Sequence, residues 1–530
     1  MNRLLNKANQ RIGLGSAALL LVVVALFGQA LGFLRNRLIS ANFTVVDPGS
    51  SDAFFVAFQI PDFFYYTIAA GALGVAVIPF LSDKLEKSDR RGLWELTNSL
   101  LNLLALVMTA VSVVMFVFAK PLVHLLAPNL PANHLQDAVT IMQLISFNPL
   151  LFTLSGILAS VQQTFGRFFF YAVAPLSYNL SIIISVFLFR DNIGIVGLGY
   201  GALAGAILQL IIISFGLLGL GYRYRPQIMW RLTEFRGMLR QLPPRSLDQG
   251  IDQVNSIVEV NRAQALGVGP VSWYNFAYIL HNVPIMLIGN SIATAAFPRL
   301  VERLAQGRPD LFRRDFLRIL RTVIWLSMPV AVISYFCRGY LARLIFGDVA
   351  PEVALIFGYL VVAIVFRTIY AMMSRYFYAQ KDTKTPLFVS IFAIGLNIFL
   401  VFRLARADTY GISGLALAQS VVAVSEVVIL FCVMLYRDHK LFMEHAFWSG
   451  LGRIMSVTGF SLLAAFLMVS VLPLQIDDRG FIALGTKLFS IVGVTLLVHI
   501  VISALFGLEE AKYVLTKTRD IVLRPIKIQT

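Results

Sequence analysis

Long apolar stretches alternate with short polar segments along almost the whole chain. Each stretch approaches or exceeds about 20 residues, the length that an α-helix needs to cross the hydrocarbon core of a bilayer. Backbone groups in lipid must be satisfied within the segment itself, so we predict that these stretches are helices. Fourteen spans are expected, at 14–39, 53–81, 94–118, 135–163, 168–189, 193–221, 246–268, 271–298, 316–337, 351–379, 384–403, 411–435, 449–474 and 480–507.

Sequence landmarks recur at a nearly constant distance in the two halves of the chain. Gln162 and Gln380 are 380 − 162 = 218 positions apart, and Asn179 and Asn397 are separated by the same number. This spacing indicates one ancestral unit used twice, and such repeats are typical of transporters. We therefore predict an all-α polytopic membrane protein with about 14 transmembrane helices, in two six-helix lobes plus two C-terminal helices.

The predicted organisation follows from this repeat. Its parts are an N-lobe at 1–221 (helices 1–6), a cytoplasmic basic linker at 222–245, a C-lobe at 246–437 (helices 7–12), helices 13–14 at 438–507 and a basic cytoplasmic tail at 508–530.

Composition supports a membrane protein and argues against a soluble enzyme. Charged residues make up 14% of the chain, compared with about 25% in soluble domains. No phosphate-binding loop, HExxH metal motif or GxSxG elbow occurs, and no soluble domain remains to hold an active site. Cys337 and Cys432 lie in apolar spans without metal-binding spacing. We expect no enzymatic activity, no metal and no cofactor, although a coupling ion or the membrane potential can supply energy.

The net charge of +16 is concentrated in alternate loops. One set of loops is rich in lysine and arginine at 84–91, 223–245 and 299–314, whereas the opposite set carries isolated cations such as Lys120 and Arg190. This asymmetry follows the positive-inside rule, so both termini are predicted to be cytoplasmic. The pattern favours contact of the basic tail with membrane lipids, and nucleic acid is not expected as a partner.

Polar residues in the seventh span form a stripe. Its members are spaced by 4, 3, 4 and 3 positions, which places them on one helical face: Asp248, Asp252, Asn255, Glu259 and Arg262. Leaving its four charges in lipid costs about 10 kcal/mol on insertion scales. The stripe predicts a water-filled cavity that binds substrate. The alternative is an internal pair of Glu259 and Arg262 with a solvated cytoplasmic end at Asp248.

The second span combines polar groups with a bend. Asp52 and Gln59 are seven residues apart and share a face, Pro61 removes a helix hydrogen bond, and Gly71 allows close helix approach. We expect Asp52 and Gln59 to line a transport path, with Pro61 and Gly71 in structural or gating roles. Asp52 as a cap of its own helix is a compatible alternative.

Two arginines lie within or at the end of apolar spans. Arg35 ends the first span and can extend to the headgroups, whereas Arg367 lies deep inside the tenth. The planar guanidinium makes bidentate charge-assisted hydrogen bonds that suit phosphate. We therefore expect Arg367 to line a cavity, where such an arginine suits a phosphate group.

Several of these strings resemble those of one family. DAFFVAFQIP opens span two, GFLR ends span one, PVSWYNFA opens span eight and SRYFYAQKDTKTP closes span ten. Together they resemble the MurJ/MviN lipid II flippases of the multidrug/oligosaccharidyl-lipid/polysaccharide exporter superfamily. The resemblance implies fourteen helices, two lobes around a cavity, a groove for a polyprenyl tail at helices 13 and 14, and a multi-pass place in the bacterial cytoplasmic membrane.

The resemblance also implies roles for individual residues. The positions that match family motifs are Arg35, Asp52, Asn255, Ser272, Arg375 and Asp382. Ser272 joins the expected substrate-binding set, and Arg375 and Asp382 join the structural or gating set. Basic residues usual in the family are replaced here by Gln29, Tyr65 and Tyr66.

The resemblance implies a flippase that moves undecaprenyl-diphosphate-linked peptidoglycan precursor between leaflets. For this implied substrate, we hypothesise that Arg35, Arg262 and Arg367 converge on the diphosphate. Cell-wall synthesis machinery is a further expected partner. One alternative is an ion-coupled exporter of small amphiphiles. The other is a divergent paralogue that no longer transports and acts as a cell-wall assembly scaffold, and the missing basic residues favour it.

Overall fold

A computed structural model describes residues 14–43, 50–70, 77–475, 477–478 and 480–511. Within these ranges the side chains at 14–19, 22, 69–70, 241–249, 251 and 348 are not described. The protein is 84% helical with no strand in the described part of the chain, which confirms the all-α prediction. The chain divides into two compact units, residues 1–272 and 273–530.

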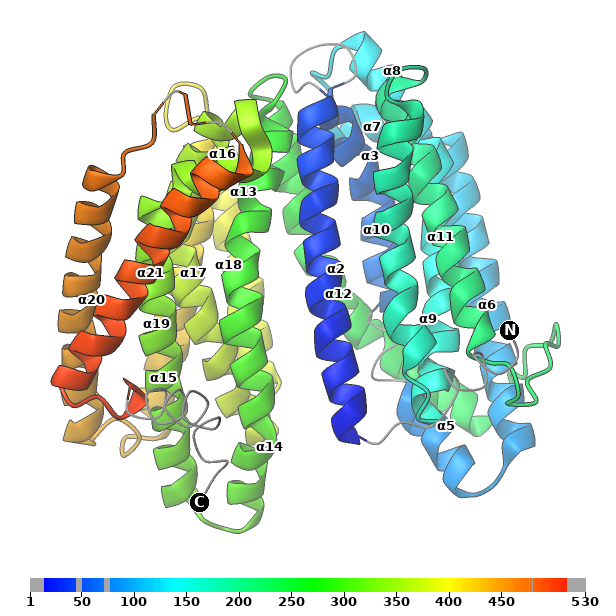
Figure 1. The fold of residues 1–530 in the computed structure, drawn as a ribbon. Helices are drawn as coiled ribbons and strands as arrows, with labels where there is room; N and C mark the ends of the chain where they lie inside the picture. Colours follow the sequence, from blue (N-terminus) through cyan, green and yellow to red (C-terminus); the bar gives the residue numbers. More distant parts are fainter. Residues whose placement is uncertain (1–13, 44–49, 71–76, 476, 479, 512–530) are drawn as a thin grey trace, which may run out of the picture. The chain divides into compact units, whose positions relative to one another are not determined.

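The first unit is a helical bundle (Figure 1). Its elements are α2 (Leu14–Asn42), α3 (Ser51–Phe64), η1 (Tyr65–Ala70), α5 (Val77–Glu86), α6 (Arg90–Val117), α7 (Ala119–Leu126), α8 (Ala132–Ile145), α9 (Asn148–Thr164), α10 (Phe169–Phe189), η2 (Gly194–Val196), α11 (Gly197–Phe215) and α12 (Thr233–Gln264).

The second unit begins within α13 and carries the remaining helices. They are α13 (Pro270–Pro284), η3 (Ile285–Asn290), α14 (Ser291–Ala305), α15 (Pro309–Phe336), α16 (Arg338–Phe346), η4 (Gly347–Val349), α17 (Ala350–Ala379), α18 (Lys384–Leu404), α19 (Ser413–Arg437), α20 (His445–Val471) and α21 (Phe481–Leu505). Helices α20 and α21 pack against each other and against α15.

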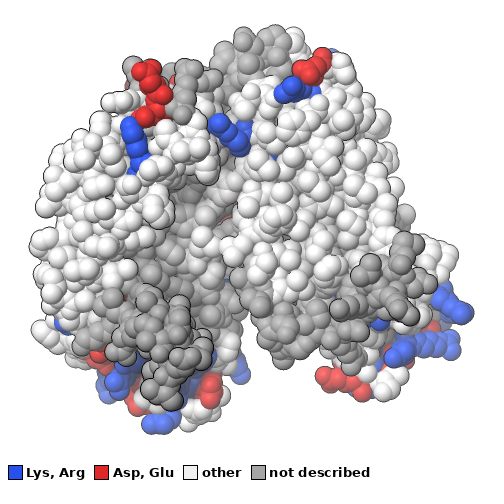
Figure 2. All heavy atoms as spheres, in the orientation of Figure 1, with Lys and Arg blue, Asp and Glu red and all other residues white. Residues whose placement is uncertain are grey.

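Eleven helical segments in the described residues are long and apolar enough to cross a membrane. The other three predicted spans, at 14–39, 53–81 and 246–268, fall on α2, on α3 with η1, and on α12. On the face shown in Figure 2, charged side chains gather at the ends of each unit and a broad uncharged band lies between them. This distribution is what a bilayer requires of the helices that it surrounds.

A π-helical segment interrupts a predicted continuous span in each unit. Segment η1 follows α3, which contains Pro61, and η3 follows directly after Pro284. Proline cannot donate a helix hydrogen bond, and π-helical turns are one way in which a helix accommodates the lost bond. The first residues of the two segments are 285 − 65 = 220 positions apart, close to the offset of the sequence landmarks.

The basic linker differs from the sequence prediction. Residues 222–229 have no regular secondary structure, but a helix starts at Thr233 and runs without interruption to Gln264. The helix begins early because Phe235 and Met238, three positions apart, are fully buried in the hydrophobic core of the first unit. Helix α12 also packs on α3 and η1, so it lies within the first unit, whereas the sequence assigned residues 246–268 to the C-lobe.

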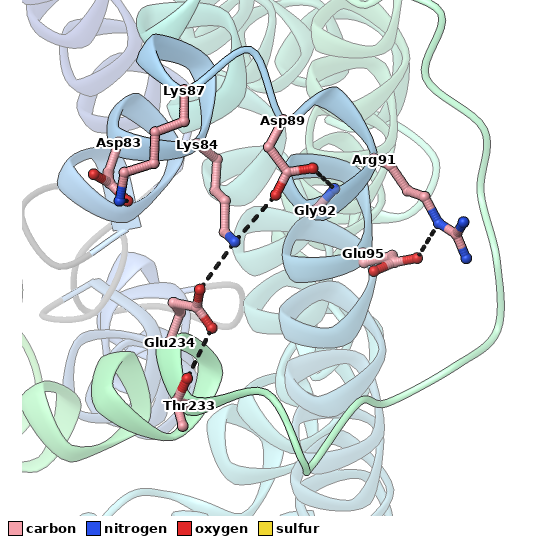
Figure 3. Close-up of polar contacts among 9 residues, drawn as sticks. All are labelled: Asp83, Lys84, Lys87, Asp89, Arg91, Gly92, Glu95, Thr233 and Glu234. Atoms are coloured by element: carbon pink, nitrogen blue, oxygen red, sulfur yellow. Dashed lines mark hydrogen bonds and ion pairs between the residues drawn. The ribbon is translucent and has the colours of Figure 1, made fainter.

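Lys84 fixes the start of α12 to the rest of the first unit (Figure 3). Its Nζ lies 2.9 Å from Glu234 Oε1 and 3.1 Å from Asp89 Oδ2. Asp89 caps α6 by accepting a hydrogen bond from the Gly92 N–H at 2.8 Å. The hydrogen bond from Lys84 lowers the pKa of Glu234 from its ordinary 4.5. A carboxylate with a lowered pKa contributes more to the free energy of unfolding when it is ionised than when it is protonated.

This arrangement predicts a local pH dependence. Because the folded-state pKa of Glu234 lies below its unfolded value, its stabilisation is present at neutral pH and is lost as the pH falls below 4.5 through the folded pKa. Relative to Glu234→Gln at the same pH, wild-type amide protection in the first turn of α12 should be about threefold higher at neutral pH. This difference should disappear in acid, as measured by hydrogen exchange with mass spectrometry.

Asp83→Asn provides the matched control, because Asp83 pairs with Lys87, which directly follows α5, and not with α12. It should leave the protection of α12 unchanged. Equal protection of wild type and Glu234→Gln at neutral pH would contradict the role of the Lys84 contact.

Candidate functional site

Asp52 connects the start of α3 to residues 269–272, where the first unit ends. Its carboxylate is fully buried and accepts hydrogen bonds from the Gly269 N–H at 2.6 Å and the Ser272 N–H at 2.8 Å. The Ser272 hydroxyl also donates to Asp52 Oδ1 and lies 2.8 Å from the Ser51 hydroxyl. The structure thus brings together Asp52 and Ser272, two of the predicted site residues.

The backbone at Gly269 makes this contact possible. Gly269 has a φ of 112°, a conformation that side chains disfavour, and its N–H points to the carboxylate. The cap of α3 is the side chain of Ser50, which accepts from the Asp52 N–H. Asp52 therefore does not cap its own helix and instead satisfies backbone N–H groups at the start of α13, where a negative charge is favourable.

Arg35 is the centre of a polar cluster in the first unit. Its polar neighbours there are Asp62, Tyr178 and Asn179. Arg35 Nη1 donates to Asn179 Oδ1 at 3.0 Å, which connects α2 to α10. Arg35 also interacts electrostatically with Asp62 and Tyr178. Arg35 is half-buried and has a carboxylate close to it within its own unit.

The polar stripe of α12 becomes progressively buried along the helix. Asp252 is exposed, Asn255 is half-buried, and Glu259 is buried and accepts a hydrogen bond from the Asn255 amide at 3.0 Å. Gln59 of α3 joins this region, because its Oε1 accepts from the hydroxyl of Ser256 at 3.0 Å. Arg262 is half-buried. The interpretation of the stripe as a water-filled cavity stays a prediction.

Arg367 is the centre of a polar cluster in the second unit. Its polar neighbours there are Gln419, Glu426 and His281. Arg367 Nη1 lies 2.7 Å from Glu426 Oε2, and Nη2 donates to Gln419 Oε1 at 3.2 Å. The side chain of Glu426 is only 4% exposed, against 30% for Arg367. His281 is buried and within electrostatic range of Arg367. Arg367 thus connects α17 to α19 through an ion pair.

Arg375 and Asp382 make contacts that explain their place in the SRYFYAQKDTKTP string. The Arg375 guanidinium lies 5.7 Å from the ring centres of Phe297 and Tyr378. Asp382 precedes α18, accepts from the Thr385 N–H at 3.1 Å, and pairs with Arg437 at the end of α19. Burial raises the pKa of Asp382, but hydrogen bonds from Thr385 and Arg437 outweigh it and lower the pKa to about 2.

The structure shows polar partners that the sequence prediction left out of the site. Glu426 is an acid within the apolar span 411–435, so the same cost of burying a charge in lipid identifies it. Asp62 follows Pro61 directly, whereas Asn179 served only as a landmark of the repeat. Pro61 is buried within α3. The predictions for Gly71 and for the side chain of Asp248 lie outside the described residues.

Two of the three predicted phosphate-binding arginines therefore have carboxylate neighbours. Arg35 has Asp62 and Arg367 has Glu426. A guanidinium has five N–H donors, so a single carboxylate cannot occupy all of them. Arg35 and Arg262 lie in the first unit and Arg367 in the second, and the convergence of the three stays a prediction. Among the described residues no group of three His, Cys, Asp or Glu side chains is arranged to hold a metal ion.

Comparison with known proteins gives a consistent family. The family model described as lipid II flippase MurJ matches residues 48–513. A probable lipid II flippase MurJ of Thermotoga maritima is 25% identical over 498 residues, which cover 93% of this chain and 96% of that protein. The probable lipid II flippase MurJ of Borreliella burgdorferi is 23% identical over 433 residues, 80% of this chain and 84% of its own length.

Solved structures agree on the fold. A lipid II flippase MurJ in an inward closed conformation superposes with a TM-score of 0.74 at 22% identity, over 92% of this chain and 98% of that chain. An inward-facing MATE-family multidrug transporter of the MOP superfamily gives a TM-score of 0.65 at 14% identity, over 80% of this chain and 98% of that chain. This multi-pass bacterial membrane protein belongs to the MurJ family.

Proposed function

We propose that the protein is a flippase that moves lipid II, an undecaprenyl-diphosphate-linked peptidoglycan precursor, across the bacterial cytoplasmic membrane. The family match over residues 48–513 carries this proposal. The relatives named as lipid II flippases align over most of both chains. Transport needs no covalent chemistry, so no enzymatic activity and no cofactor are expected, and a coupling ion or the membrane potential supplies the energy.

The diphosphate of such a substrate needs cationic donors once water is removed. Arg35, Arg262 and Arg367 are our candidates, and each is only half-buried. Because the carboxylates of Asp62 and Glu426 are near two of them, the charges of Arg35 and Arg367 are partly compensated, each within its own unit, before substrate binds. We propose that the diphosphate replaces or shares these carboxylates as the partner of the arginines.

The paired arginines also support a second candidate, a paralogue that serves as a cell-wall assembly scaffold. Arg367 and Glu426 satisfy each other without a ligand, as a purely structural ion pair does. Either function places the protein in the cytoplasmic membrane. From the arginine asymmetry we propose that both termini and the segment 222–245 lie in the cytoplasm.

Complementation of a bacterium depleted of its lipid II flippase tests the proposed function. Wild type should restore growth and should expose lipid II on the outer leaflet, detected in a leaflet-resolved assay. Arg35→Ala, Arg262→Ala and Arg367→Ala should each lower transport by roughly 10- to 100-fold, the effect of losing one hydrogen bond to a charged group. Arg231→Ala, at an exposed linker position, should retain full transport.

Full activity of all three alanine variants would show that the diphosphate is held by other groups. A wild-type protein that inserts but does not complement would favour the scaffold function.

A double substitution separates substrate binding by Arg367 from its structural pairing. Arg367→Gln alone leaves the buried Glu426 carboxylate without its guanidinium and should destabilise the protein by about 3–5 kcal/mol. The double variant Arg367→Gln with Glu426→Gln removes both charges and should recover most of this stability, measured by thermal unfolding in detergent. If Arg367 binds substrate, the double variant stays defective in transport. Transport that recovers together with stability would assign Arg367 a structural role only.

Cysteine labelling tests the orientation. In a background without Cys337 and Cys432, Arg231→Cys should react with a membrane-impermeant maleimide only after the cells are opened. Asp191→Cys, in the exposed loop between α10 and α11, should react in intact cells. The reverse pattern would invert the assigned topology.

A further inference from the structure

A four-residue segment of alternating tyrosine and arginine follows α11. It consists of Tyr222, Arg223, Tyr224 and Arg225, and it has no regular secondary structure. We call residues 222–225 the YRYR strap.

Two asparagines of α6 hold the strap in place. The hydroxyls of Tyr222 and Tyr224 donate to the Asn98 and Asn102 side-chain oxygens at 2.9 and 2.8 Å. The amides of the same asparagines donate to the carbonyl oxygens of Arg223 and Arg225 at 3.0 and 2.7 Å. Asn98 and Asn102 are four residues apart and therefore share a face of α6. The strap is thus a built element of the first unit, held against α6 at Asn98 and Asn102.

The strap arginines line a basic surface pocket with a volume of about 480 Å³. Arg90 and Arg91, from the first turn of α6, contribute two more guanidiniums, and Glu95 is the one acid that lines it. Glu95 pairs with Arg91 at 2.9 Å. Among the described residues Arg90, Arg223 and Arg225 form no ion pair. The N-terminus of α6 carries a partial positive charge from the helix dipole, which adds to the charge of these arginines. This pocket therefore attracts an anion.

An apolar pocket of about 290 Å³ borders the same strap. Leu101, Leu217 and Leu218 line it together with the rings of Tyr222 and Tyr224. Leu101 lies seven residues beyond Trp94 on α6, or roughly 10 Å along the helix. Trp94 lines the basic pocket and contacts the ring of Tyr222, and tryptophan is typical of the membrane interface. A charged pocket at headgroup level is thus followed by an apolar one at greater depth.

The second unit has a basic pocket of a different kind. It has a volume of about 360 Å³ and is lined by Arg314, Arg318 and Arg321. Here the chain supplies its own acids, because Arg321 pairs with Glu509 and Glu510. At the strap the matching acids are missing from the described lining apart from Glu95. The described lining of the strap pocket therefore keeps a net positive charge, with four arginines against one glutamate.

We propose that the YRYR strap and the start of α6 bind an anionic glycerophospholipid of the cytoplasmic leaflet. The arginine distribution predicts that the strap lies on this side of the membrane. The phosphodiester of the headgroup contacts Arg90, Arg223 and Arg225, and an acyl chain lies over Leu101 and Leu218. Basic pockets beside transmembrane helices suit such headgroups, and guanidiniums bind phosphate oxygens in pairs. This site is separate from the proposed transport function and does not depend on it.

Native mass spectrometry of the full-length protein with dioleoyl phosphatidylglycerol or dioleoyl phosphatidylcholine tests the site. Wild type should retain phosphatidylglycerol in preference to phosphatidylcholine. Arg223→Gln with Arg225→Gln should bind phosphatidylglycerol roughly 30-fold more weakly, as expected for two lost cationic contacts. The matched control, Arg231→Gln with Arg236→Gln, removes the same charge from exposed positions that line neither pocket, and it should bind as wild type.

Two further measurements decide the identity of the ligand and guard against misfolded variants. Water-soluble glycerol 3-phosphate at the same concentration should not displace the lipid, and displacement would show a phosphate site without an acyl-chain contact. Brominated phosphatidylglycerol should quench the fluorescence of Trp94, obtained as the difference between wild type and Trp94→Phe, more than brominated phosphatidylcholine does. Equal quenching by the two lipids, or equal retention by the pocket and control variants, would overturn the proposal.

Discussion

A charged side chain inside an apolar helical bundle needs a partner, and this requirement determines how each unit is built. Removing a charge from water without compensation costs far more than one helix contact returns. In the second unit Arg367 pairs with Glu426, and Arg321 pairs with Glu510. In the first unit Asp52 is compensated by backbone N–H groups and a hydroxyl. The polar groups therefore act as the specific connections between otherwise interchangeable apolar helices.

This constraint changes how a flippase of this family handles an anionic substrate. A site of unpaired arginines attracts a diphosphate strongly and releases it slowly. Here the guanidiniums of Arg35 and Arg367 already have carboxylate neighbours, so the substrate binding that we propose would be an exchange of partners. An exchange has a smaller net free energy than the formation of a new ion pair, because the pairing that is lost offsets the pairing that is gained. Tyr65 and Tyr66, at positions where the family usually has basic residues, fit the same weaker electrostatic field.

Local pattern was sufficient to predict the fold, and non-local contacts limited the prediction of the site. Span length and hydrophobicity depend on neighbours in sequence, so the helices were predictable, with errors where Phe235 extends α12 and where η1 and η3 interrupt a span. Motif resemblance identified Asp52 and Ser272, which the structure joins. It gave no indication that Arg367 contacts Glu426, because that pairing depends on how α17 packs against α19.

The uneven distribution of arginines between the two sets of loops shows the same difference between local pattern and non-local contacts. Counting cations per loop predicts an orientation, but it treats all arginines as equivalent. In the structure Arg313 pairs with Asp438 and Arg321 with Glu510, so these cations serve the connection of helices in the second unit. Arg223 and Arg225 instead extend from a strap that is held by its backbone and by tyrosine hydroxyls. Since their positions are fixed without their charges, those charges remain available for a ligand.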